Sequence, residues 1–404
     1  MEGAVLALNA GSSSVKFALY GATDNGAPSL VARGVVEGLE TSPRLSAKDA
    51  KGAAVDERRW PEKTAYHTLL SDLLEWVDAH LNEVSLIAVG HRVVHGGRGF
   101  TAPVRIDEAV MKALEALTPL APLHQPHSLA PVRIVTDVRP GLPQVACFDT
   151  AFHHTMPPVA ARYALPRALE DDGVRRYGFH GLSYEFIAGR LREAAPELAV
   201  GKVVVAHLGN GASLCALSNG RSIDTTMGFT ALDGLIMGTR CGAIDPGVLL
   251  YLLQEKKLDP GALETLLYRD SGLLGVSGLS SDMRVLLDSA DDHARDAVEL
   301  FVYRVARETA ALAGSLEGLD GFVFTGGIGE HAAEIRSAVC ERLAWFGVVP
   351  DHEANAAQAG RISAAGSRVD VRVIPTDEEI TIARHTLEIL RAVTPSHSYA
   401  RHPL

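Results

Sequence analysis

Cysteine is scarce in this chain, with four residues among 404. None of them forms a C-x-x-C pair, so the spacing indicates neither a zinc site nor a disulfide framework. We expect the four thiols to be small buried or half-buried side chains. They are Cys147, Cys215, Cys241 and Cys340.

Positive charge is also in short supply. Lysine and arginine number 38 against 49 acidic residues, a formal net charge of −11. This balance argues against nucleic acid as the main partner, because phosphate backbones are bound by clustered lysines and arginines. An anionic ligand would have to be attracted by local positive groups, since the field of the whole protein repels it.

Long hydrophobic runs are missing as well. No apolar stretch reaches the roughly 18 residues needed to span a bilayer. The first ten residues, MEGAVLALNA, lack the basic region of a signal peptide and pass directly into an apolar segment. Together with the sparse cysteines, these absences predict a cytoplasmic protein without a membrane partner.

What remains is the composition of an ordinary globular protein, with 47% hydrophobic and 22% charged residues. A length of 404 residues favours two domains, each able to bury a core of its own.

Residues 8–20 read LNAGSSSVKFALY. Apolar and polar residues alternate after the turn, which predicts strands over 4–9 and 15–20 joined by a small, serine-rich turn. Two interpretations stay open for this turn. Its small side chains would let backbone N–H groups approach a phosphate, but glycine, asparagine and serine are also common in ordinary hairpins.

A second segment, KVVVAHLGNGASLCAL (202–217), repeats this pattern. Its turn glycine, Gly211, lies 200 residues after Gly11, and Ser213 then matches Ser13. The repeat predicts a duplicated domain. Two similar domains commonly hold a ligand in the cleft that they form.

A third glycine-rich stretch, at 321–346, predicts a strand that ends at Thr325, a turn over Gly326–Gly329 and then a helix. Such a connection can present helix N–H groups to a phosphate, or it can be a tight turn that needs glycine for a positive φ. Residues 371–390 predict a strand, an acidic turn and a helix. The turn T-D-E-E (376–379) either caps that helix or supplies carboxylates to Mg²⁺.

Polar side chains gather where the predicted strands end, which is where open α/β sheets place their ligands. Arg92 and Arg240 each lie close to glycines, which favours an approach to ligand, although a loop arginine is usually a solvated surface group. His180 is open to a structural role and Asp149 to a capping role. The polar residues at strand ends are Asn9, Arg92, Asp149, His180, Asn210, Arg240, Glu378 and Glu379.

Taken in order, the motifs of this chain resemble those of the acetate kinase family, from residue 5 to about 390. No single motif is decisive, but nine of them at the right separations are specific. They read LNAGSSSVKFALY, GHRVVHGG, FDTAFH, RRYGFHGLSY, VVAHLGNGASL, DTTMGFTALDGLIMGTRCGAIDPG, SGLSSDMR, FTGGIGEH and PTDEE.

This resemblance implies the α/β fold of the actin, chaperone-ATPase and sugar-kinase superfamily. Two duplicated ribonuclease-H-like domains would enclose an interdomain active-site cleft. The N-terminal domain would comprise residues 1–150 plus about 385–404, and the C-terminal nucleotide-binding domain residues 151–384. The family also implies a homodimer.

The implied reaction is ATP + acetate ⇌ ADP + acetyl phosphate, with Mg²⁺ or Mn²⁺ as cofactor. Asn9 and Glu378 match the metal-site residues of the family, and Arg92 matches the clamp on the acetate carboxylate. Val94, Leu123 and Phe179 would line a pocket for the methyl group.

Asp149 matches the active-site aspartate of the family, and His180 and Arg240 match its transition-state stabilisers. The residues that the resemblance places around the phosphates and the nucleotide are Ser12, Ser14, Lys16, His207, Leu208, Gly209, Asn210, Gly211, Asp282, Met283, Arg284, Gly326, Gly327, Ile328, Gly329 and Glu330.

The implied chemistry agrees with the residue types. A carboxylate titrates near ~4.3, so an acetate nucleophile needs no general base at neutral pH. The enzyme must instead bring one anion to another, and arginines are suited to this because they are permanently charged, planar forks. We therefore interpret Asp149 as an orienter of an arginine or of hydrated Mg²⁺, and not as a base.

Four positions depart from common family patterns: Ala231, Cys241, Gln125 and His331. Ala231 replaces a frequent proline, and a wider pocket there would admit propionate. A propionate or butyrate kinase on the same scaffold is one alternative, because one methylene is worth only ~1–3 kcal/mol of discrimination. An actin-like or chaperone-type ATPase is the other.

Overall fold

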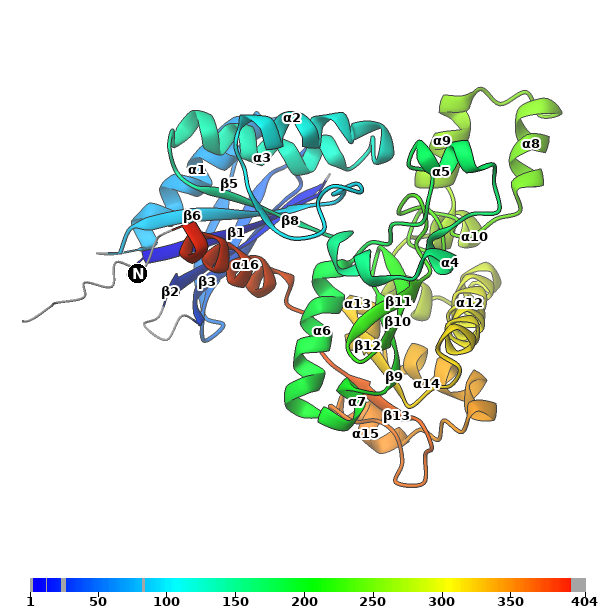
Figure 1. Cartoon of the computed structure of the whole chain (residues 1–404). Helices are drawn as coiled ribbons and strands as arrows, with labels where there is room; N and C mark the ends of the chain where they lie inside the picture. Colours follow the sequence, from blue (N-terminus) through cyan, green and yellow to red (C-terminus); the bar gives the residue numbers. More distant parts are fainter. Residues whose placement is uncertain (1–2, 12, 23–26, 82–83, 394–404) are drawn as a thin grey trace, which may run out of the picture. The chain divides into compact units, whose positions relative to one another are not determined.

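The computed structural model describes residues 3–11, 13–22, 27–81 and 84–393. The chain divides into two compact units (Figure 1). Unit 1 comprises Met1–Ala151 and Asp377–Leu404, and unit 2 comprises Phe152–Thr376. Ser12 and the last eleven residues lie outside the described residues.

In the described part of unit 1, eight strands form one sheet. Strands β1 to β5 pair antiparallel in succession, β6 and β8 run parallel to β1, and β7 is antiparallel to β8. The strand–turn–strand predicted over residues 8–20 is confirmed as β1 and β2. Across the sheet the strands are β5 (Ala54–Arg59), β4 (Arg44–Asp49), β3 (Pro28–Glu37), β2 (Ser14–Ala22), β1 (Gly3–Ala10), β6 (Leu86–Val93), β8 (Gln144–Phe148) and β7 (Val104–Arg105).

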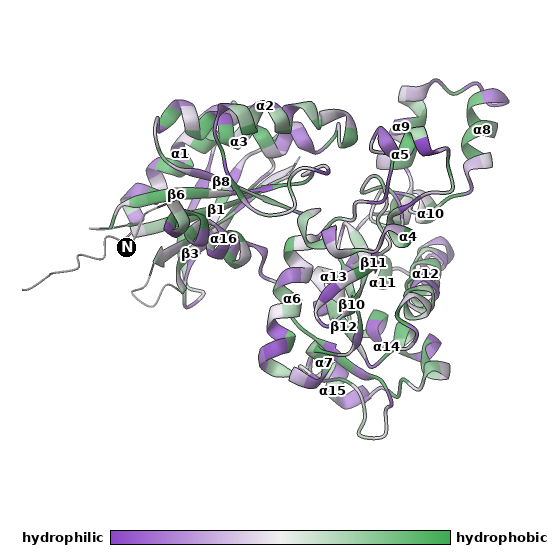
Figure 2. Cartoon of the chain, in the orientation of Figure 1, coloured by the Kyte–Doolittle hydropathy of each residue, from purple (hydrophilic) through white to green (hydrophobic). Residues whose placement is uncertain are grey.

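Helices cover both faces of this sheet. On one face, α1 (Tyr66–His80) and α3 (Gln125–Val138) share a buried cluster with β1 and β2. The mixed green and purple of α1 in Figure 2 reflects its amphipathic pattern. On the other face lies α16 (Glu378–Val393), so closely that a Cβ at Gly90 would be 2.5 Å from Ile382. Only glycine fits there. Unit 1 also holds α2 (Glu108–Ala116) and a 3₁₀ turn at Thr118–Leu120.

Unit 2 repeats the central part of this topology, which confirms the predicted duplication. Its order is β11 (Arg221–Thr225), β10 (Ala212–Ser218), β9 (Lys202–Leu208), β12 (Gly321–Thr325) and β13 (Asp370–Val373). The first three strands are antiparallel, and β12 and β13 run parallel to β9. Strands β3-β2-β1-β6-β8 of unit 1 have the same order and directions.

Two layers of helices cover the sheet of unit 2. The α6 helix (Gly181–Ala194) and α7 (Pro196–Ala199) share a buried cluster with β9 and β10. The long α12 helix (Asp292–Leu316) packs against β9, β10 and β11. The remaining helices are α4 (Pro158–Ala161), α5 (Arg167–Asp171), α8 (Pro246–Gln254), α9 (Pro260–Arg269), α10 (Gly272–Ser277), α11 (Met283–Leu287), α13 (Gly326–His331), α14 (Ala333–Arg342) and α15 (His352–Ala356), with 3₁₀ turns at Ala151–Thr155 and Ala344–Phe346.

The expectation of a turn over Gly326–Gly329 is wrong in its conformation. These residues open the short helix α13, and a separate helix, α14, follows. Gly326 has a φ of 76° and lies so close to the Leu208 carbonyl oxygen that a Cβ would be 2.8 Å from it. The glycine is therefore required at Gly326, as predicted, but it starts a helix directly.

The chain re-enters unit 1 at Asp377, whereas the resemblance suggested about residue 385. The whole of α16 packs on the sheet of unit 1, so the crossing precedes the helix. Among the described residues, no helix combines the length and apolarity needed to cross a membrane.

Candidate active site

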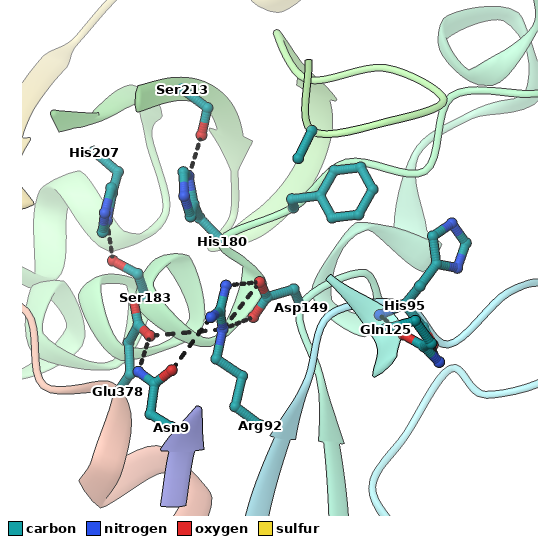
Figure 3. A network of polar contacts seen from close by, with 12 residues as sticks. Asn9, Arg92, His95, Gln125, Asp149, His180, Ser183, His207, Ser213 and Glu378 are labelled. Atoms are coloured by element: carbon teal, nitrogen blue, oxygen red, sulfur yellow. Dashed lines mark hydrogen bonds and ion pairs between the residues drawn. The ribbon is translucent and has the colours of Figure 1, made fainter. Parts of the chain in front are cut away.

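The carboxyl ends of β1, β6 and β8 meet at one edge of the unit 1 sheet because these strands are parallel. Asn9 and Arg92 lie at the ends of β1 and β6, and Asp149 follows β8 directly. Side chains alternate along a strand, so Arg92 shares a face with Gly90, the face covered by α16. The three side chains converge there (Figure 3).

Arg92 is held as a fork. Its Nε donates to Oδ1 and Oδ2 of Asp149 at 2.9 and 3.1 Å, and its Nη2 donates to Oδ2 at 2.5 Å. Its Nη1 donates to Oδ1 of Asn9 at 3.2 Å. Burial lowers the pKa of Arg92, but the charges of Asp149, Glu378 and Glu379 and the hydrogen bonds to Asp149 together outweigh burial and raise it. The guanidinium is therefore fixed in place and permanently charged.

The acidic turn before α16 contains a capping residue, as one of the two interpretations of the sequence predicted. Oδ1 of Asp377 accepts from the backbone N–H of Ile380 at 3.0 Å, which caps the helix. Asp377 also pairs with Arg33 at 2.9 Å and accepts from Tyr20 at 3.3 Å. The next residue, Glu378, faces the polar cluster instead.

Asn9 and Glu378 are in contact, with Nδ2 of Asn9 2.9 Å from Oε2 of Glu378. Oε1 of Glu379 lies 3.3 Å from the same amide. Burial and the charge of Glu378 raise the pKa of Glu379. Lys16 lies opposite Asn9 in the β1–β2 register. This edge thus supplies carboxylate and amide oxygens, the hard ligands that Mg²⁺ takes beside phosphates and water.

The segment after β6 is held by Gln125. Its Nε2 donates to the carbonyl oxygens of His95 and Leu114, both at 3.1 Å, and its Oε1 accepts from His95 N–H at 3.2 Å. Val94, just before this tie, is buried, and Leu123 is half-buried. The side chain of Gln125 thus fixes the backbone at His95 and Leu114.

In unit 2, His180 caps α6 in the left-handed conformation, with a φ of 58°. Its ring stacks on His207 of β9 at 4.3 Å and 20°. A serine holds each ring: Ser213 Oγ is 2.8 Å from Nδ1 of His180, and Ser183 Oγ is 2.8 Å from Nδ1 of His207 (Figure 3). A non-glycine residue in this conformation marks a position that the surroundings enforce.

The turn between β9 and β10 brings further predicted residues to these rings. A Cβ at Gly211 would lie 3.3 Å from Nε2 of His180 and 3.0 Å from Nη2 of Arg240. Arg240 is anchored by its Nη1, which donates to the Ala231 carbonyl oxygen at 2.6 Å. Asn210 accepts from Gly238 N–H at 3.0 Å. The guanidinium of Arg240 and the imidazole of His180 therefore lie side by side at the glycine turn.

The Gly326–Glu330 segment is tied to the end of β13. Oε1 of Glu330 accepts from the N–H groups of Gly326 and Thr376, at 2.9 and 3.1 Å. The hydroxyl of Thr376 is in turn 2.9 Å from Oγ of Ser183. A hydrogen-bonded path thus connects α13 with the ring of His207, since Ser183 also contacts that ring.

The comparisons with known proteins decide the family. The acetokinase family profile matches residues 4–384. An acetate kinase of Rhodopseudomonas palustris is 56% identical over 389 residues, 95% of this chain and 98% of that protein. This chain belongs to the acetokinase family.

Two solved structures have the same fold as this chain. A Francisella tularensis propionate kinase has a TM-score of 0.87 at 37% identity and covers 95% of this chain and 98% of its own. Porphyromonas gingivalis acetate kinase has a TM-score of 0.83 at 38% identity, and the match covers 96% of this chain and 100% of that protein. The predicted fold class is confirmed.

Not every residue carried over from the acetokinase family joins these clusters. Asp282 caps α11 through Arg284 N–H, and the exposed Arg284 side chain folds back onto it. Met283 is buried. Phe179 is buried in unit 2, and its carbonyl oxygen accepts from Nε2 of His153 at 2.9 Å.

The sequence did not reveal the buried contacts of Arg336. Its side chain is fully buried, and Nη1 donates to the carbonyl oxygens of Gly329 and Glu330 at 3.0 and 2.8 Å. Nε and Nη2 donate to Asn355. The guanidinium thus holds the last turn of α13. An arginine within the polar pattern of α14 looks like a surface residue, so no sequence signal marks it.

Proposed function

We propose that this chain is an acetate kinase that catalyses ATP + acetate ⇌ ADP + acetyl phosphate. An acetate oxygen attacks the γ-phosphorus in line, a P–O bond to that oxygen forms, and the bond to the β–γ bridging oxygen breaks. ADP leaves with the electron pair. The family of this chain and the acetate kinases among its curated relatives support the proposal.

One observation carries the chemistry: the guanidinium of Arg92, fixed by Asp149 and Asn9 at the carboxyl ends of three parallel strands. A planar, always charged fork suits a carboxylate. Asp149 supplies the orientation, so it acts on the acid through Arg92. No base is needed, because acetate is already ionised.

Unit 2 supplies groups for the phosphoryl end. Arg240 offsets negative charge as it spreads over the transferring oxygens, a role in which an arginine is worth roughly 10³–10⁵ in rate. His180 donates a hydrogen bond to one of those oxygens. The turn at Gly209–Gly211 would face the phosphates with backbone N–H groups. The N–H groups of α13 after Gly326, whose own N–H donates to Glu330, would do the same.

Mg²⁺ would find its oxygen donors in the Glu378 carboxylate, which accepts from Nδ2 of Asn9, and in Oδ1 of Asn9, which accepts from Arg92. When bound, the ion would neutralise phosphate charge. The described residues contain no cluster of three or more metal-binding side chains. Both protein oxygens are held in place, Asn9 by Arg92 and Glu378 by the first turn of α16.

The deciding experiment is a hydroxylamine trap. Purified protein with ATP, Mg²⁺ and acetate should yield acetyl hydroxamate and ADP in equal amounts. ADP without hydroxamate would contradict the proposal and favour a plain ATPase. Heat-inactivated protein and a reaction without acetate are the controls.

Propionate is a second acceptor to test, because a propionate kinase has the same fold and because Ala231 replaces a common proline. The carbonyl oxygen of Ala231 accepts a hydrogen bond from Arg240, so Ala231 lies beside one of the proposed catalytic side chains. The values of kcat/KM for acetate, propionate and butyrate rank the acceptors. We expect acetate first, with propionate within about 100-fold.

A homodimer in the cytoplasm completes the proposal. The α8 helix has no buried residue, although it reads PGVLLYLLQ. Leu250 and Tyr251 are 54% and 50% exposed, and an exposed apolar face of this kind commonly marks an interface. Sedimentation of Leu250→Glu should show a monomer where the native chain is dimeric.

A further inference from the structure

Behind His180 lies a buried chain of two hydroxyl groups that the proposed reaction has not used. Nδ1 of His180 is 2.8 Å from Oγ of Ser213, and that Oγ is 2.5 Å from the Tyr184 hydroxyl. Ser213 and Tyr184 are both 0% exposed. All three residues belong to unit 2, at the start of α6 and of β10.

The positions follow from the sequence. Tyr184 lies four residues after His180, on the same side of the first turn of α6. Ser213 lies two residues before Cys215 on β10, and Cys215 belongs to the buried cluster under α6. Ser213 therefore points to the same helix. The chain of contacts is built into regular structure and not into a mobile loop.

The direction of these hydrogen bonds can be assigned. Burial raises the pKa of Tyr184 well above its ordinary value, so the phenol keeps its hydrogen. Among the described residues, the hydrogen-bond partner of that hydroxyl is Ser213 Oγ. A buried donor left unsatisfied is costly, so Tyr184 donates to Ser213. Ser213 must then donate to Nδ1 of His180, which acts as an acceptor.

An imidazole that accepts at Nδ1 carries its hydrogen on Nε2. Nε2 faces the glycine turn, because a Cβ at Gly211 would lie 3.3 Å from it and 3.0 Å from Nη2 of Arg240. The geometry thus presents two N–H donors at one turn.

We propose that Ser213 and Tyr184 are positioning residues that hold His180 as the neutral Nε2–H tautomer, aimed at an oxygen of the transferring phosphoryl group. This inference rests on the proposed function for the identity of that oxygen. The tautomer itself is a property of the protein alone. Without the two hydroxyls, no donor holds Nδ1 as an acceptor, and the Nδ1–H form, which cannot donate toward Gly211, is no longer excluded.

The test combines ¹⁵N NMR of histidine-labelled protein with kinetics. His180→Gln identifies the signals of His180 by difference, and the ¹⁵N shifts report which nitrogen carries the hydrogen. The native protein should show the Nε2–H form. Ser213→Ala should admit the Nδ1–H form beside it and lower kcat about tenfold, with the KM for ATP within about twofold. Tyr184→Phe should mix the two tautomers, because Ser213 can then accept from Nδ1–H.

Two variants serve as matched controls. Ser213→Thr keeps a hydroxyl on a strand that tolerates β-branching, so tautomer and kcat should be retained. Tyr177→Phe removes a buried hydroxyl of unit 2 that donates to the Gly173 carbonyl oxygen, and it should leave the His180 signals unchanged.

An Nδ1–H tautomer in the native protein would overturn the inference. So would unchanged His180 signals and unchanged kcat in folded Ser213→Ala and Tyr184→Phe proteins. If Ser213→Ala fails to fold, Tyr184→Phe decides. An Nε2–H tautomer in a protein that forms no acyl hydroxamate would uphold the hydroxyl chain and reject the proposed function, so the two failures are distinguishable.

Discussion

The carboxylate of Asp149 is 1% exposed and lies against the guanidinium of Arg92, with three N–H···O contacts between them. The aspartate thus has no exposed oxygen edge with which to serve as a base in this arrangement. Its physical role is to set the angle of the arginine fork, and the fork in turn can take a planar anion.

Asp149→Asn tests this relationship. The amide keeps the shape but removes the charge and one acceptor, so Arg92 is held less firmly. We expect kcat/KM for acetate to fall roughly 10²-fold, since small misplacement of a positioning group costs about that much. Steady-state kinetics at saturating Mg²⁺ measure it. The exposed Asp137→Asn is the control, and near-normal turnover in Asp149→Asn would remove the orienting role.

Gly211→Ala tests the meeting of His180 and Arg240 at the glycine turn. The new methyl group would lie 3.0 Å from Arg240 Nη2 and 3.3 Å from His180 Nε2, so both side chains must shift by a few tenths of an ångström. We expect kcat to fall about tenfold or more with little loss of stability. Gly189→Ala in α6, where a Cβ has nothing within 4 Å, should leave kcat unchanged.

Arg336→Lys tests the buried guanidinium beneath α13. Lysine cannot reach four acceptors at once, so the carbonyl oxygens of Gly329 and Glu330 lose their donor. We expect the KM for ATP to rise about tenfold while the KM for acetate stays the same, together with a lower melting temperature. A drop in stability with both KM values unchanged would show that the contact is structural only. The exposed Arg295→Lys is the control.

His153 makes a prediction about acid stability. Burial lowers its pKa from 6.5 to about 4. Between these values the unfolded chain binds a proton that the folded chain does not, so the free energy of unfolding falls as pH falls from 6.5 to 4. The loss is about 1.4 kcal/mol per pH unit for this group. Urea unfolding at pH 7 and 5 should show a shallower pH slope for His153→Gln.

The exposed His352→Gln is the control for that slope. An equal slope in the native protein and His153→Gln would contradict the burial argument. Buried His91 and His95 have lowered pKa values of about 4 as well, so His153→Gln should reduce the slope and not abolish it.

The elements and several site positions were predictable from local patterns. Alternation predicted β1, β2, β9 and β10, and the parallel strands placed Asn9 and Arg92 at one edge. Tyr184, Gln125 and Arg336 were not predictable, because their partners lie far along the chain or on another element. Their residue types and spacings match ordinary core or surface positions. The helical start at Gly326 was missed because its hydrogen bonds to Glu330, within α13, and to Arg336, on α14, are not visible in the glycine pattern.

The roles of the carried-over residues remain predictions, as does the cleft that the resemblance implies. At the Tyr184 hydroxyl, one buried contact with Ser213 assigns the direction of two hydrogen bonds.

Helix α16, at 378–393, covers one face of a sheet that begins at residue 3. During synthesis the apolar surface around Gly90 is therefore exposed until more than two hundred later residues have left the ribosome. A prematurely ended chain would lack both this cover and Glu378. Truncated products thus expose an apolar face, which makes them natural clients for chaperones and proteases.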